Sequence, residues 1–102
     1  MQQVQMNGII DENLSITLLG DIDLGNAETF YNEVMEAYAK TPASITFACD
    51  KLNFIDSTTL GTFVKIMKTL KADGKSVRLT GLQAKIKKLF VICALDSVMQ
   101  ID

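Results

Sequence analysis

The sequence predicts an α/β protein with a mixed β-sheet that begins with an antiparallel hairpin. Alternating apolar residues at 14–19, preceded by a polar turn and a more weakly patterned segment, indicate two strands near the start of the chain. After this hairpin, helical and strand-like periodicities follow one another to the end of the sequence. The length of 102 residues fits one domain, residues 1–102, which should bury roughly 60 to 70% of its unfolded surface.

The opening hairpin is predicted from residues 4–10 and 14–19. The first segment has only a weak pattern, whereas apolar and more polar residues alternate in the second, as in a strand buried on one face. Asp11-Glu12-Asn13 supplies the polar turn between them. Residues 20–26 are then expected to form a loop.

A first helix is expected to start at Gly25 or Asn26 and to end at Thr41-Pro42, because proline disfavours the helical conformation of the residue before it. One face repeats apolar residues at helical spacing, and the other carries several glutamates. The apolar residues are Ala27, Phe30, Tyr31, Val34 and Tyr38. The acidic face is interpreted as a solvated surface.

The middle of the chain predicts a central strand followed by a second helix. Residues 44–49 form an apolar run that ends at the polar pair Asp50-Lys51. Residues 53–55 then lead into a helix over residues 58–72, whose apolar stripe faces away from its lysines. Asp73-Gly74 stops this helix.

The last third predicts a strand, a helix and a short edge strand. Residues 76–80 alternate, residues 82–92 return to helical spacing, and residues 98–101 are short enough for an edge. Three lysines of the helix are expected to be solvated: Lys85, Lys87 and Lys88.

Charge and hydropathy exclude several classes of function. The net charge of −2 provides no basic field for a phosphate backbone, so nucleic acid is not an expected partner. No apolar run approaches the ~20 residues of a membrane span, and the first residues do not resemble a signal peptide. We therefore expect a cytoplasmic protein that is not inserted in a membrane.

The residues that usually bind metals or act as general bases are scarce. There is no histidine, and Cys49 and Cys93 alone would make a poor zinc site, so neither a metal nor a cofactor is expected. Both cysteines stand among apolar neighbours and are expected to be small buried hydrophobes, with a redox pair as the alternative.

The segment Asp56-Ser57-Thr58-Thr59 is the main candidate for function. Short polar side chains at a helix start can cap its free amides, which accounts for one or two of these residues. The same amides also tolerate a phosphoryl group, which would make Ser57 a phosphate acceptor. Because no glycine-rich phosphate loop is present, the phosphate would have to come from another protein. Both interpretations stay open on these residues alone.

Several segments, in order and across nearly the whole chain, are similar to STAS domains, the family that contains bacterial anti-sigma factor antagonists. Residues 54–61, with the sequence FIDSTTLG, resemble the family signature Asp-Ser-Ser-Gly-Leu-Gly. Residues 20–23 (GDID) and 27–30 (AETF) resemble the first loop and helix of the family. Residues 85–90 (KIKKLF) and 95–98 (LDSV) resemble its last helix and closing strand.

This resemblance implies a mixed sheet with helices packed mainly on one face, and a protein that switches between partners. Such an antagonist, while unphosphorylated, binds an anti-sigma factor with serine kinase activity and so releases a sigma factor. The kinase modifies the serine after the aspartate, here Ser57, and a phosphatase is a further expected partner. The expected docking residues are Asp21, Asp23, Asp56, Ser57, Thr58, Thr59, Leu60 and Gly61.

The sequence departs from the family signature at Thr59, where glycine is usual. A β-branched residue there adds bulk to a surface that a partner would approach, and Thr58 becomes a second candidate acceptor. For Asp23, a turn residue bonded to local amides is the alternative to a docking role.

Two other functions are compatible with the sequence. Related domains resemble regulatory subunits of ABC transporters, and neighbouring genes would separate that role from sigma regulation. Catalysis by Asp21, Asp23 and Asp56 is conceivable because nearby carboxylates can divide acid and base roles, but nothing in the sequence fixes their separation. The chain is therefore not expected to be an enzyme.

Overall fold

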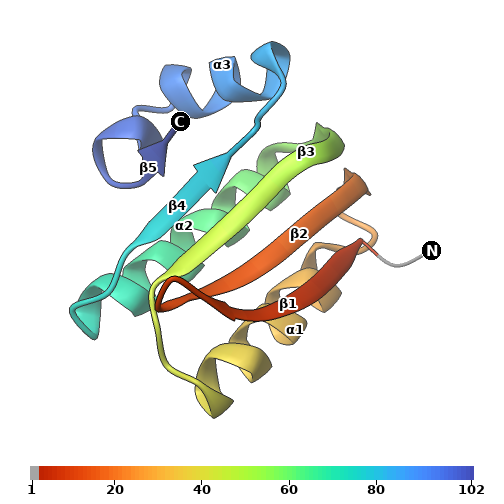
Figure 1. Cartoon of the computed structure of the whole chain (residues 1–102). Coiled ribbons are helices and arrows are strands. Elements are labelled where there is room, and N and C mark those ends of the chain that lie inside the picture. Colours follow the sequence, from red (N-terminus) through yellow and green to blue (C-terminus); the bar gives the residue numbers. More distant parts are fainter. Residues whose placement is uncertain (1–2) are drawn as a thin grey trace.

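The structure, a computed structural model, describes residues 3–102 and contains one five-stranded sheet and three α-helices (Figure 1). Within these residues, no helix has the length and apolar character needed to cross a membrane. The elements in chain order are β1 (Val4–Ile10), β2 (Asn13–Ile22), α1 (Ala27–Lys40), β3 (Ile45–Ile55), α2 (Ser57–Ala72), β4 (Val77–Thr80), α3 (Ala84–Ile92), a 3-10 turn (Leu95–Ser97) and β5 (Gln100–Ile101).

The five strands lie side by side in sequence order, which confirms the predicted mixed sheet. β1 is antiparallel to β2, and every later pair is parallel. The hairpin turns at Asp11 and Glu12, whose φ angles of 52° and 72° suit the tight turns that join twisted strands. The outer strand β1 is irregular: its register shifts between Met6 and Ile9, around Gly8 with a φ of 77°.

Two strands extend further than predicted. β2 includes residues 20–22, which were expected to belong to a loop, and β3 continues past Asp50-Lys51 to Ile55. The buried positions of β3 are two residues apart up to Cys49 but three apart after it, and the β2–β3 register shifts in this region. A pattern with period two therefore ends before the strand does.

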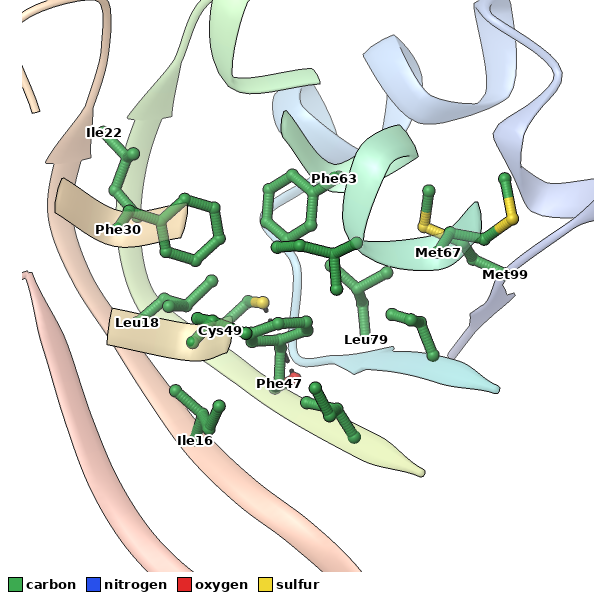
Figure 2. Close-up of a cluster of buried hydrophobic side chains, with 14 of the residues drawn as sticks. Ile16, Leu18, Ile22, Phe30, Phe47, Cys49, Phe63, Met67, Leu79 and Met99 are labelled. Atoms are coloured by element: carbon green, nitrogen blue, oxygen red, sulfur yellow. Dashed lines mark hydrogen bonds between the residues drawn. The ribbon is translucent and has the colours of Figure 1, made fainter. Parts of the chain in front are cut away.

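The predicted helices form, and α1 and α2 cover the same face of the sheet (Figure 1). The core lies between this face and the helices and is shown in Figure 2. Four aromatic rings form its centre, and the centroid of the Phe63 ring lies 5.2 to 5.5 Å from the centroids of the other three. They are Phe30, Phe47, Phe63 and Phe90, one from each of α1, β3, α2 and α3.

The two cysteines have different environments. Cys49 is buried in the core, as predicted, and burial raises the pKa of its thiol to about 12. Cys93, however, is exposed, so the prediction of a buried thiol was wrong there. It follows the last residue of α3, where the apolar neighbours Val91 and Ile92 are also exposed.

The C-terminal elements are shorter than predicted. α3 begins at Ala84 rather than at residue 82, and β5 contains only Gln100 and Ile101. Residues 95–97, between them, form a 3-10 turn. α3 still contributes Ile86 and Phe90 to the core, at the side of the molecule where β4 and β5 lie (Figure 1).

Candidate phosphorylation and docking site

The candidate site lies where β2 and β3 end. These strands are parallel, and their last residues, Ile22 and Ile55, are register partners. The loop that follows β2 and the start of α2 therefore lie side by side at the C-terminal ends of these two strands. The carboxyl ends of parallel strands are a common place for binding sites in α/β proteins.

Asp56 joins that loop to α2. One carboxylate oxygen, Oδ1, accepts a hydrogen bond from the backbone N–H of Thr59 at 3.0 Å, which caps the helix. The other, Oδ2, accepts one from the backbone N–H of Leu24 at 2.9 Å. The hydrogen bond from the Thr59 amide is the main cause that lowers the pKa of Asp56, and the Leu24 amide adds to it. The Asp56 side chain is therefore ionised at neutral pH.

Thr59 points into the protein. Its side chain is fully buried, and its hydroxyl lies 2.7 Å from the carbonyl oxygen of Ile22 and 3.0 Å from Oδ1 of Asp56. A hydroxyl has one hydrogen, so we assign the donated bond to the shorter contact, with Ile22. The expectation that the Thr59 side chain faces a partner was wrong, because this residue fills the junction between β2 and α2.

Ser57 and Thr58 are both exposed in the first turn of α2. Neither hydroxyl makes a hydrogen bond to any group in residues 3–102. Capping thus accounts for Asp56 and, through its amide, Thr59, but not for the two hydroxyls between them. Of the other predicted docking residues on α2, Gly61 is exposed and Leu60 is half-buried.

The loop after β2 is held by its own polar side chains. Oδ1 of Asp23 accepts the Gly25 N–H at 2.9 Å, and Oδ1 of Asn26 accepts the Asp23 N–H at 2.8 Å. The Asn26 side-chain amide donates to the backbone oxygen of Asp21 at 3.0 Å. Asn26 precedes α1, as predicted, but its side chain makes no capping bond to the helix. Asp23 therefore bonds a local amide, while the Asp21 side chain is exposed.

Two exposed apolar residues near Ser57 were missed by sequence reasoning. Leu24 is 75% exposed although its backbone amide is bonded to Asp56. Phe54 is 47% exposed near the end of β3, three residues before Ser57. A leucine inside an otherwise polar loop was the available signal for the first of these residues.

A groove between α1 and α2 adjoins Thr58. It has a volume of about 390 Å³, and Leu24 lies at it together with residues from both helices. The Nζ of Lys65 lies 4.4 Å from the centre of the Tyr31 ring, a cation–π contact that crosses the groove. The remaining lining residues are Ala27, Glu28, Asn32 and Thr62.

The three aspartates proposed as alternative catalytic groups do not form a metal site. Within residues 3–102, no group of three histidine, cysteine, aspartate or glutamate side chains is placed to hold a metal ion. Both carboxylate oxygens of Asp56 are bonded to backbone amides, and Asp23 bonds its own loop. These contacts describe a structural role for both side chains.

Comparison with known proteins identifies the family. The STAS domain model matches residues 4–102. The anti-sigma-B factor antagonist of Bacillus subtilis (strain 168) is 28% identical over 92 residues, covering 90% of this chain and 84% of the relative. A candidate anti-sigma factor antagonist from Thermotoga maritima has a similar structure, with a TM-score of 0.83 and 22% identity, over 96% of this chain and 84% of that one. The phosphorylated form of the Bacillus cell fate determinant SpoIIAA gives a TM-score of 0.75 and 22% identity, over 97% and 90% of the two chains. The chain belongs to the STAS domain family.

Proposed function

We propose that this chain is an anti-sigma factor antagonist that acts in the cytoplasm. Its unphosphorylated form binds an anti-sigma factor with serine kinase activity and thereby releases a sigma factor. Phosphorylation of Ser57 blocks this binding, and a phosphatase restores it. The proposal rests chiefly on the Ser57 hydroxyl, which is exposed and unbonded to residues 3–102 at the start of α2.

Similarity to known antagonists supports this proposal. The relative from Bacillus subtilis is named an anti-sigma-B factor antagonist, and SpoIIAA has a phosphorylated form. Ser57 follows Asp56 at the position where the STAS signature has its phosphorylated serine. Ser57 is the one hydroxyl residue of the segment Asp56-Ser57-Thr58-Thr59 that is both exposed and directly after Asp56. Thr59 is buried, and Thr58 is one position further on.

The geometry is suited to phosphoryl transfer from a kinase. The Ser57 oxygen attacks the γ-phosphorus of ATP bound to the partner, the bond to the β,γ-bridging oxygen breaks, and ADP leaves. The hydroxyl proton passes to a base on the kinase. Ser57 need not break any hydrogen bond to a group in residues 3–102 before it reacts. Asp56 cannot readily serve as that base, because two backbone amides hold its carboxylate.

Phosphorylation would change binding more than folding. A phosphoserine carries about −1.5 to −2 charges, and its interaction with a helix start is worth ~0.3 to 1 kcal/mol. The carboxylate of Asp56 offsets part of this gain, so the fold should be almost unchanged. Burying an uncompensated dianion in an interface costs several kcal/mol, and each ~1.4 kcal/mol weakens binding tenfold.

The docking surface is proposed to include the loop after β2 as well as the start of α2. Asp56 connects the two by bonding the Leu24 amide, so the loop and Ser57 keep a fixed relative position. Leu24 presents an apolar contact, Asp21 presents an exposed carboxylate, and Asp23 maintains the shape of the loop. An Asp23→Asn variant that binds and is phosphorylated like the wild type would limit Asp23 to a role in the turn.

The test uses the full chain, its cognate anti-sigma kinase and ATP. We expect Ser57→Ala to bind the kinase without incorporating phosphate, and Ser57→Asp to bind at least tenfold more weakly. Thr58→Ala is the matched control, since it removes the neighbouring exposed hydroxyl. Affinity is measured by calorimetry, and phosphate incorporation by mass spectrometry of the intact chain.

The outcomes distinguish the possible acceptors and partners. Undiminished labelling of Ser57→Ala would reject Ser57, and loss of labelling in Thr58→Ala alone would assign the reaction to Thr58. Binding to a transporter subunit, with no interaction with any anti-sigma factor, would replace the proposal with the transporter role.

A further inference from the structure

A hollow lies between the end of β3 and α3. It has a volume of about 180 Å³, and most of the side chains around it are apolar. Phe54 is 47% exposed and Leu89 is 36% exposed, so two large apolar side chains border it without being covered. The full set of lining residues is Asn53, Phe54, Ile55, Lys85, Ile86 and Leu89.

The helix beside this hollow has a basic and apolar outer face. Lys85, Lys88, Leu89 and Ile92 are spaced so that they share one side of α3, and all four are exposed. Ile92 is 69% exposed. The sequence of α3 contains no acidic residue, and neither lysine belongs to the two ion pairs formed within residues 3–102. The positive charge beside the hollow is therefore not neutralised.

We infer that the hollow and this face of α3 form a docking site for an acidic amphipathic segment of a partner protein. A large apolar side chain of that segment enters the hollow between Phe54 and Leu89. Its carboxylates lie against Lys85 and Lys88. This combination of an apolar anchor in a pocket with complementary charges at the rim is typical of helix-in-groove recognition. The inference does not depend on phosphorylation of Ser57.

The geometry favours a protein segment over a membrane surface. A helix that lies on a bilayer needs a broad apolar face that projects into the lipid, with basic residues on the opposite side. In α3 the apolar residues Ile86 and Phe90 face the core. Around the rest of the helix circumference, exposed apolar residues alternate with lysines. The hollow can hold a single large side chain of a protein segment, whereas a bilayer surface has no such side chain to fill it.

A second copy of this chain also fits less well. Its acidic helix α1 would have to meet α3, but Glu36 already pairs with Lys40 at 3.3 Å. A head-to-tail contact between two different surfaces of identical chains leaves one of each surface free, so it must close into a ring or continue into a filament. An acidic partner segment satisfies the lysines without this consequence.

The test is a titration of the ¹⁵N-labelled full chain with a short helical peptide of glutamate and alanine that carries one central leucine. We expect amide shifts at residues that line the hollow, such as Phe54 and Leu89. The shifts should be small with a control peptide in which the central leucine is replaced by alanine. Lys85→Glu and Leu89→Ser should each weaken binding by about tenfold. Both positions are exposed, and the charge change at Lys85 leaves the apolar packing intact.

Matched control variants come from the other side of the same helix. Lys87→Glu and Val91→Ser change exposed residues outside the hollow and should bind the peptide like the wild type. Ser57→Asp should also bind the peptide like the wild type. A failed peptide titration would therefore leave the proposal for Ser57 intact, and a failed kinase assay would leave the inference about α3 intact. Three results would each overturn the inference: equal shifts with the alanine peptide, binding to phosphatidylglycerol vesicles but not to the peptide, or self-association through α3 alone.

Discussion

The hydroxyl of Thr59 donates a hydrogen bond to the carbonyl oxygen of Ile22 at 2.7 Å, which joins the first turn of α2 to the last residue of β2. Both groups are buried, so water cannot replace the bond. The buried side of the first turn of α2 is thereby fixed to the sheet, while Ser57 and Thr58 remain exposed to solvent. A threonine in place of the usual signature glycine thus strengthens the base of the site without covering it.

Replacing Thr59 by valine should destabilise the protein by about 1 to 3 kcal/mol. Valine keeps the shape of the side chain but leaves the Ile22 carbonyl without its partner in a buried site. Urea denaturation measures the change. Thr58→Val is the control and should alter the free energy of unfolding by less than about 0.5 kcal/mol, because residue 58 is exposed. Equal effects of the two substitutions would show that the Thr59–Ile22 bond is not important for stability.

Stability should decrease in acid because of Asp56. Its pKa is lowered in the folded state, mainly by the Thr59 amide, so its contribution is present above the ordinary value of 3.8 and is lost as the pH falls through the folded pKa. Asp56→Asn should flatten this part of the stability profile, measured by thermal melts across the acid range. Asp21→Asn, near the end of β2, is the control for removing one exposed carboxylate. A profile unchanged by Asp56→Asn would contradict the assignment.

Tyr38 connects the end of α1 to the end of α2. Its hydroxyl donates to Oδ2 of Asp73 at 2.7 Å, and Tyr38→Phe should cost about 0.5 to 1.5 kcal/mol in the free energy of unfolding. Tyr31→Phe is the control, since it keeps the ring beneath Lys65.

The same tyrosine predicts sensitivity to alkali. Burial, followed by the hydrogen bond and the charge of Asp73, raises the pKa of Tyr38 from 10.0 to about 12. Its contribution to stability is therefore complete below pH 10 and is lost as the pH rises toward 12. Tyr38→Phe should remove this part of the alkaline decline in chemical denaturation, whereas an unchanged decline would assign it to other groups.

The two thiols should react at very different rates. Cys93 is exposed, whereas Cys49 is buried with a pKa raised to about 12, which leaves almost no thiolate at neutral pH. A maleimide should add once to the native protein and twice after unfolding, as measured by mass spectrometry. Cys93→Ser should remove the rapid addition, and rapid labelling of Cys49 in that variant would contradict its burial.

The order of the elements could be predicted because most have a regular apolar period. The helices and the hairpin follow from spacing within each segment. The length of β3 could not, because its buried positions change from every second to every third residue where its register with β2 shifts. The exposure of Cys93 was missed for a similar reason: the apolar run that ends α3 passes beyond the part of the helix that reaches the core.

The candidate site was predictable only where its residues are neighbours in the sequence. A cap within Asp56-Ser57-Thr58-Thr59 follows from a local helix-start pattern, and the structure assigns it to Asp56, with the helix starting at Ser57 rather than at residue 58. The bond from Leu24 to Asp56 and the burial of Thr59 depend on the alignment of Ile22 with Ile55 across two strands. That alignment is a tertiary property, which a single sequence does not specify.

The register shift around Gly8 in β1 reduces the ability of the outer strand to pair with a strand of another molecule. A long, straight outer strand offers an unbroken row of amide and carbonyl groups to which a strand from another molecule can add, the first step toward fibrils. In residues 3–102 one margin of the sheet is interrupted by the register shift around Gly8, and the other is the two-residue β5. Neither is a good template for growth. We therefore expect concentrated solutions of this protein to resist strand-to-strand polymerisation.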